Sequence, residues 1–196
     1  MKKVVMLGDS LRMSYWKRTA ELLADICEVY GPEEICAYAM HTLRRVRGWF
    51  REWGLDRADL IHWNNGVWDH HRSAEDGEPL SSPEMYLSLC GRLSDELLRH
   101  TDRLVFASTS PAGAGYEYRP DWLTGLPLDG WNREVAEYNA LAAALLVRRG
   151  VKINDIHGLL TAHPEFIGPD GIHLSEAGVE AVARQTAACI RRELSE

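Results

Sequence analysis

The chain of 196 residues contains only four cysteines and no long apolar run. The opening Met1-Lys2-Lys3 is followed by too few apolar residues for the hydrophobic region of a signal peptide, and no stretch approaches the length of a transmembrane helix. The cysteines have no CxxC spacing, so neither a metal site nor a disulfide framework is indicated: Cys27, Cys36, Cys90 and Cys189. The sequence therefore predicts a cytoplasmic protein with reduced thiols.

The chain also lacks an excess of positive charge: 22 lysines and arginines stand against 29 aspartates and glutamates, which gives a formal net charge of −7. Nucleic acids and anionic membranes require a basic face, so neither is expected as a partner. Four arginines do cluster on a short amphipathic segment, where they indicate a solvated helix face: Arg44, Arg45, Arg47 and Arg51. The expected partner is a small molecule, and the sequence makes no prediction about the oligomeric state.

Repeats, low-complexity tracts and linkers are absent, and the length suits one hydrophobic core, so a single domain over residues 1–196 is predicted. Helical patterns alternate with five short β-like runs, at 3–7, 28–30, 60–63, 104–108 and 151–154. This alternation predicts a parallel sheet with helices on both faces, a three-layer α/β/α architecture. Helices are expected after Ser82-Pro83, from 131 to 149, and from Ser175 onward.

Two short segments, one near each end of the chain, carry the residues of a hydrolytic triad. Ser10 follows an apolar run and precedes a helical pattern, so it should lie where a strand's carboxyl end meets a helix. His173 follows Asp170 by three residues in a stretch with glycine and proline, so one turn can hold the carboxylate against Nδ1 while Nε2 faces a serine. Ser10, His173 and Asp170 are therefore predicted as nucleophile, base and orienting carboxylate. The alternative is a helix cap at Ser10 and an Asx turn at Asp170.

These segments resemble two sequence blocks of the SGNH hydrolases, the GDSL-type esterases and acylhydrolases. Gly8-Asp9-Ser10-Leu11 is similar to the serine block, and the closing block is matched by the nine residues from Asp170 to Gly178. The resemblance implies a five-stranded parallel sheet in the flavodoxin-like order 2-1-3-4-5, and ester hydrolysis through an acyl-enzyme without a metal or other cofactor. It also implies that Asp9 shapes the turn that carries the serine. Asp9 is in addition predicted to contact substrate.

The middle blocks depart from the family pattern. The second block has a glycine whose N–H lines the oxyanion hole, but residues 36–40 contain none; Ala37 or Ala39 could donate instead, and Ala39 is the primary candidate. The third block is usually GxND, whereas Gly66-Val67-Trp68-Asp69 has tryptophan in place of asparagine. A divergent branch of the family has an asparagine two residues before the glycine. Asn64 is therefore the expected oxyanion donor beside the Ser10 N–H, with Asn65 in reserve.

Two long segments, 67–82 and 110–130, are rich in tryptophan, tyrosine and histidine. Trp68 and Tyr116 are predicted to contact substrate. Four aromatic residues could stack on a sugar, pack an acyl chain, or simply anchor their loop: Tyr116, Tyr118, Trp122 and Trp131. His70 and His71 are expected to be exposed or to contact substrate. Since these segments contain few aliphatic residues, small acyl groups are favoured, acetyl groups on carbohydrate included.

Two other functions remain open at this stage. The altered middle blocks would suit a noncatalytic protein of the same fold that binds a carbohydrate or acyl ligand. The histidine-rich segment would suit a metal-assisted hydrolase, although adjacent histidines on an extended loop point in different directions. An intact set of Ser10, His173 and Asp170 favours serine esterase activity over both.

Overall fold

A computed structural model describes residues 1–72, 76–117 and 126–195. Five parallel strands form one sheet in the order β2-β1-β3-β4-β5, which confirms the predicted fold class and strand order. Each strand differs from its predicted bounds by at most one residue: β1 (Lys2–Leu7), β2 (Cys27–Tyr30), β3 (Leu60–Trp63), β4 (Leu104–Ala107) and β5 (Lys152–Asn154).

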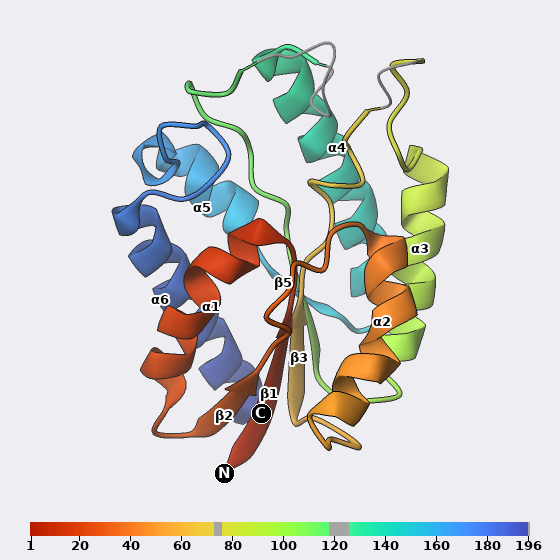
Figure 1. Ribbon diagram of the computed structural model, residues 1–196, viewed down its shortest axis with the longest axis vertical. Coiled ribbons are helices and arrows are strands. Elements are labelled where there is room, and N and C mark those ends of the chain that lie inside the picture. The colour runs from red at the N-terminus through yellow and green to blue at the C-terminus, as the bar shows by residue number, and fades with distance from the viewer. Residues whose placement is uncertain (73–75, 118–125, 196) are drawn as a thin grey trace.

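Helices cover both faces of this sheet (Figure 1). One face packs against α1 (Ser10–Leu23), α5 (Ile156–Ala162) and α6 (Glu176–Ser195), and the other against α2 (Ala39–Glu52), α3 (Pro83–Leu97) and α4 (Leu128–Val147). The alternation of side chains along a strand explains how one apolar run serves both cores. Val4 and Met6 of β1 lie in the core under α1 and α6, and Val5 and Leu7 lie in the core under α2 and α3.

The helix starts follow local capping chemistry. The Ser82 hydroxyl accepts the Met85 N–H at 3.3 Å and Pro83 occupies the first turn, as predicted for α3. The α5 helix was not predicted, because it has only seven residues and follows β5 directly; the Asp155 carboxylate caps it by accepting the Gly158 N–H at 2.9 Å. A 3₁₀ turn, η1 (Pro164–Phe166), follows α5.

All strands point the same way, so their carboxyl ends meet at one edge of the sheet, and parallel α/β sheets build their sites there. All four cysteines are free and buried. Among the described residues, no helix is both long and apolar enough to span a bilayer.

Candidate active site

Ser10, His173 and Asp170 meet at the carboxyl edge of the sheet. Ser10 is the first residue of α1, which follows β1 after Gly8 and Asp9, and its Oγ lies 3.0 Å from Nε2 of His173. The other ring nitrogen of His173, Nδ1, lies 2.7 Å from Oδ2 of Asp170. The structure thus brings together the three residues predicted from the two ends of the chain, in the order required of nucleophile, base and orienting carboxylate.

The turn that carries Asp170 also holds its carboxylate in place. Oδ1 accepts the backbone N–H groups of Ile172 and His173, both at 2.9 Å. Partial burial opposes ionisation of Asp170, but the hydrogen bonds from the His173 ring and these two N–H groups outweigh it and keep the pKa below its usual value. The side chains of His173 and Asp170 are 51% and 53% exposed, so this pair is open to a ligand from solvent.

Gly171 is required in this turn. Its φ is 72°, and a Cβ there would lie 2.0 Å from the backbone nitrogen of Tyr116. The Gly171 carbonyl accepts the Gly113 N–H at 2.8 Å, which fixes the turn to the loop after β4. On the other side, an ion pair of 2.7 Å between Arg18 of α1 and Glu180 of α6 joins the helix of the serine to the helix that follows the histidine.

Asp9 lies behind the serine rather than in front of it. Its side chain is completely buried and caps α1 by accepting the Leu11 N–H at 3.0 Å. Burial raises the pKa of Asp9 to about 6. This corrects the expectation that Asp9 contacts substrate, because no ligand reaches a fully buried carboxyl; the capping contact agrees with a role in shaping the serine turn.

Asn64 extends β3 toward the serine. Its backbone N–H donates to the Leu7 carbonyl at 3.0 Å, and a Cβ placed on Gly8 would lie 3.5 Å from the Asn64 Cβ. The Asn64 amide nitrogen donates to the Ala107 carbonyl at 2.9 Å, which orients the amide and leaves its second N–H. Asn65, by contrast, is fully buried; its amide nitrogen donates to the Ala37 carbonyl at 2.9 Å.

The Ala39 N–H cannot serve as an unoccupied oxyanion donor in this arrangement. It donates to the two carboxylate oxygens of Asp69 at 3.1 and 3.3 Å, which corrects the primary expectation for this loop. Ala37 has a φ of 46°, in the left-handed region that favours glycine, and its N–H donates to no other described residue. The Ala37 N–H is therefore the remaining candidate in this loop for a backbone donor to the oxyanion.

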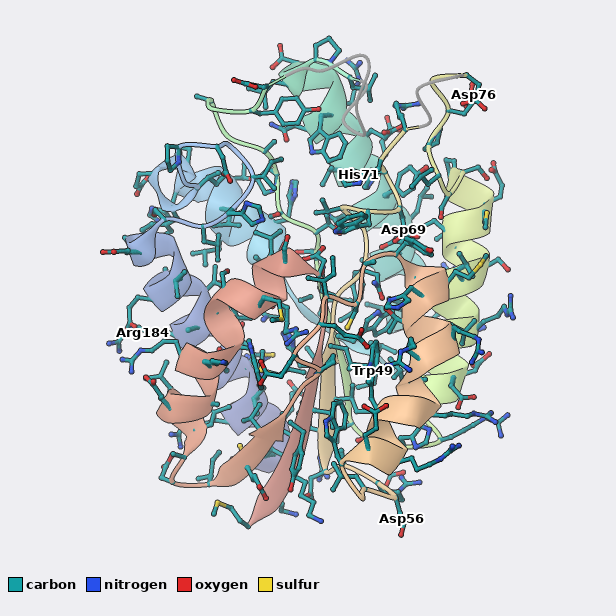
Figure 2. The ribbon with its side chains drawn as sticks, in the orientation of Figure 1. Trp49, Asp56, Asp69, His71, Asp76 and Arg184 are labelled. Carbon is teal, nitrogen blue, oxygen red and sulfur yellow. The ribbon has the colours of Figure 1, made fainter. Side chains whose placement is uncertain are left out.

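Asp69 is a buried anchor that the sequence did not single out (Figure 2). Besides the Ala39 N–H, it accepts the Ser81 hydroxyl at 2.9 Å, so it ties the start of α2 to the segment before α3. Burial raises the pKa of Asp69 to about 7, against the lowering effect of these hydrogen bonds.

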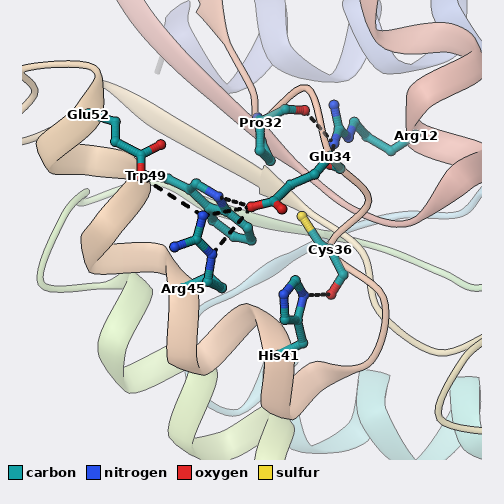
Figure 3. A network of polar contacts seen from close by, with 8 residues as sticks. All are labelled: Arg12, Pro32, Glu34, Cys36, His41, Arg45, Trp49 and Glu52. Atoms are coloured by element: carbon teal, nitrogen blue, oxygen red, sulfur yellow. Dashed lines mark hydrogen bonds and ion pairs between the residues drawn. The ribbon is translucent and has the colours of Figure 1, made fainter.

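Arg12 was also missed, and it organises the loop after β2 (Figure 3). Its guanidinium is fully buried and donates to the carbonyls of Pro32 and Glu34, both at 2.9 Å. The Glu34 carboxylate in turn accepts the Trp49 indole N–H at 2.8 Å, and the Cys36 carbonyl accepts Nδ1–H of His41 at 3.0 Å. These contacts fix the ends of the loop that carries Ala37.

Four rings form what we call the aromatic wall: Trp68, His71, Tyr116 and Trp131. Their contacts run from Trp68 to His71, to Trp131 and to Tyr116, with centroid separations of 4.9, 6.0 and 5.6 Å. The wall packs beside Leu11, which follows the serine, and Ile172, which precedes the histidine. It therefore borders the triad.

Two of the four rings in this wall, Trp131 and Tyr116, are buried. Trp131 is 1% exposed, and the Tyr116 hydroxyl donates to the Leu126 carbonyl at 2.9 Å, so both anchor their loop. Contact of Tyr116 with substrate stays a prediction, for which its burial leaves little surface, whereas half-buried Trp68 keeps an accessible surface. Burial, and then neighbouring His70, lower the pKa of His71 to about 4, which keeps its ring neutral. Tyr118 and Trp122 lie outside the described residues.

His70 is not an exposed loop residue. Its ring is fully buried against Tyr138, with centroids 4.0 Å apart, and its Nδ1 lies 3.6 Å from a carboxylate oxygen of Glu134. Within the described part of the chain, no three His, Cys, Asp or Glu side chains are grouped so that they could hold a metal ion.

A second grouping of Ser, His and Asp lies after β4 and β5, but its geometry does not suit catalysis. The Ser108 hydroxyl donates directly to the Asp155 carboxylate at 2.9 Å and accepts the His157 backbone N–H at 2.9 Å. The His157 ring meets the Thr109 carbonyl at 2.9 Å through Nδ1. Because the imidazole does not link the hydroxyl to the carboxylate, this group only joins β4 to α5.

The sheet order and flanking helices are those of the SGNH, or GDSL-type, hydrolases. Among solved structures the chain is similar to the acetyl xylan esterase AlAXEase, with a TM-score of 0.74 and 16% identity over 96% of this chain and 99% of that chain. It is also similar to a member of the lipolytic G-D-S-L family from Veillonella parvula DSM 2008, with a TM-score of 0.72, 15% identity and coverage of 97% and 98%.

A further similar structure is Axe2, an acetylxylan esterase from Geobacillus stearothermophilus, with a TM-score of 0.70, 13% identity and coverage of 100% of this chain and 94% of that chain. No protein-family model and no curated protein sequence matches the chain. At these identities the likeness establishes the fold, and the chemistry has to be inferred from the residues of this chain.

Proposed function

We propose that this protein is a serine esterase that hydrolyses small acyl esters through an acyl-enzyme. The observation that carries this proposal is the continuous set of contacts from Asp170 through His173 to Ser10. Acyl transfer requires a nucleophile, a base and an orienting carboxylate that contact one another in this order.

In the first half-reaction, Ser10 Oγ attacks the ester carbonyl carbon and His173 Nε2 takes the hydroxyl proton. The tetrahedral intermediate then collapses, and the same proton passes from Nε2 to the departing alcohol. Water repeats these steps on the acyl-serine and releases the carboxylic acid. Asp170, ionised and hydrogen-bonded to Nδ1–H, keeps the proton on that nitrogen at rest and stabilises the imidazolium that forms transiently.

Three donors would bind the oxyanion. The Ser10 N–H is the first of α1, at the positive end of the helix dipole. The second N–H of the Asn64 amide and the backbone N–H of Ala37 are the other two. The left-handed backbone at Ala37 supports the choice of its N–H as a donor. Glycine favours this conformation, and the SGNH hydrolases, which the chain resembles, have a glycine in this block.

We propose acetyl as the preferred acyl group and a carbohydrate as the alcohol. Trp68 offers a half-buried ring beside the triad on which a sugar can pack. The acetyl xylan esterases AlAXEase and Axe2 share the fold, which supports the same substrate class here. A cytoplasmic location, as expected from the sequence, belongs to this proposal.

The test is turnover of an activated acetyl ester together with labelling by a fluorophosphonate. We expect Ser10→Ala to abolish both, and His173→Ala to abolish turnover. Ser14→Ala is the matched control: its hydroxyl is on the same helix and donates to the Leu11 carbonyl at 2.6 Å, so its loss should leave labelling intact. Labelling that persists in Ser10→Ala would refute the proposed nucleophile, and a wild-type protein that neither labels nor turns over would indicate a binding protein.

A further inference from the structure

A small cavity lies between the sheet and the helices α1, α5 and α6. Its lining includes Leu11, the residue after the proposed nucleophile, and Leu174, the residue after the proposed base. Asn64, the proposed oxyanion donor, forms part of the same lining. Three residues that adjoin or belong to the proposed reacting groups therefore border one small space, although Ser10 and His173 themselves do not line it.

The volume of the cavity is about 10 Å³, which is room for roughly one water-sized group. A methyl group is of similar size. The lining contains polar groups at Tyr15, Ser108 and Ser110 as well as Asn64. The part of it formed by α5 and α6 is aliphatic, at Ile156, Leu160 and Val182, which are at most 6% exposed. An apolar wall of this kind favours a methyl group over a polar one, and close packing of the wall resists the entry of further methylenes.

Leu160 borders both this cavity and a larger space. It also lines an open cleft of about 420 Å³, together with Ala112, Asn132, His157 and Ile167. Its side chain is 1% exposed and is the residue that the two linings share, so it can act as the partition between them. Shortening Leu160 should join the small cavity to the cleft.

We infer that the cavity is the acyl pocket and that Leu160 is the residue that limits it to acetyl. This inference rests on the proposed function and adds to it the subsite and the specificity-determining side chain. A pocket closed in this way should discriminate by about 10-fold or more against each added methylene. With Leu160 truncated, a longer acyl chain can continue past α5 into the cleft.

The experiment compares kcat/KM for p-nitrophenyl acetate, butyrate and hexanoate in wild type, Leu160→Ala and Leu160→Val. We expect the butyrate-to-acetate ratio to rise by about 10-fold or more in Leu160→Ala, because the discrimination against two methylenes is relieved. A smaller rise in this ratio is expected in Leu160→Val, which removes only one methylene. This milder variant provides the test if Leu160→Ala does not fold. The folded state of each variant is checked by thermal melting.

Leu146→Ala and Leu146→Val are the matched controls. Leu146 of α4 is fully buried in the core on the opposite face of the sheet, so its truncation loosens the domain without reaching the cavity. The ratio should stay within about 2-fold of wild type in these controls, since discrimination resides in the pocket. A folded Leu160 variant with the wild-type ratio overturns the inference, as does an equal shift in the Leu146 variants. Loss of the proposed function itself would be separate, because it would show as Ser10→Ala retaining wild-type turnover.

Discussion

Replacing Asn64 by alanine tests the least conventional part of the proposed site. The amide nitrogen has two N–H groups, of which one binds the Ala107 carbonyl at 2.9 Å. The second is assigned to the oxyanion, whose negative charge develops in the transition state and is complete in the tetrahedral intermediate. Losing one such donor lowers kcat by ~10²–10³, or about 2.7–4 kcal/mol. Because the ground-state ester makes little use of this donor, KM should be nearly unchanged.

The same substitution also has a structural cost, which the assay must separate from the catalytic one. Losing the hydrogen bond to Ala107 should lower the free energy of unfolding by about 0.5–1.5 kcal/mol, and by up to about 3 kcal/mol if that carbonyl finds no other donor. Each kcal/mol corresponds to a fall in Tm of about 2–4 °C for a domain of this size. Steady-state kinetics at 25 °C on protein shown to be folded therefore report the catalytic effect.

Asn139→Ala provides the matched control. This asparagine is also buried, and its amide both accepts and donates a hydrogen bond at 2.8 Å with the backbone of Thr109. Its loss should cost as much stability with little change in kcat. If Asn64→Ala is nearly silent while Asn65→Ala or Trp68→Phe reduces kcat by ~10²–10³, the oxyanion donor has been misassigned.

Three further outcomes are expected. The double variant of Ser10→Ala and His173→Ala should be no slower than either single variant in ester hydrolysis, because the two residues act as one unit; additive losses would contradict that. Activity should survive dialysis against EDTA, and a loss restored by zinc would bring the histidine-rich segment into the mechanism. Burial raises the pKa of Asp69 from 3.8 to about 7, so between these pH values the folded chain holds a proton that the unfolded chain has lost. Stability should therefore fall with rising pH by up to about 1.4 kcal/mol per unit over that range. The free energy of unfolding of Asp69→Asn, measured in urea, should therefore rise relative to that of wild type from pH 4 to 7, and the difference should level off above pH 7. A difference that does not change with pH would refute the raised pKa of Asp69.

The sheet was predictable because its signals are local. A short apolar run between turn residues marks a buried parallel strand, and β3 begins and ends at the predicted residues. The strand order came from the family resemblance, since periodicity does not say which strands are neighbours. The α4 helix begins at Leu128, three residues before the predicted start, because Pro127 serves as its N-cap residue and no favoured capping side chain marks the position.

The residues around the triad were harder to predict than the triad. Ser10, His173 and Asp170 carry motif information, but the burial of His70 and Tyr116 depends on how two long loops pack against α4. The sequence does not distinguish Ala37 from Ala39 as backbone donors. Only the position of Asp69 in the fold shows that the Ala39 N–H is already hydrogen-bonded. Arg12 could have been noticed, because an arginine two residues after the serine, on the first turn of a core-facing helix, needs a buried acceptor.

The contact between His173 and Ser10 joins residues that are 163 positions apart in the chain. Ser10 begins α1 and His173 precedes α6, and these two helices lie side by side (Figure 1), with Arg18 paired to Glu180. The proposed triad is thus among the most nonlocal features of the molecule, and nonlocal contacts are slow to form when a chain folds. In a refolding experiment, ester hydrolysis should return after the helical signal and together with the final tertiary structure, so turnover itself reports that both ends of the chain have docked.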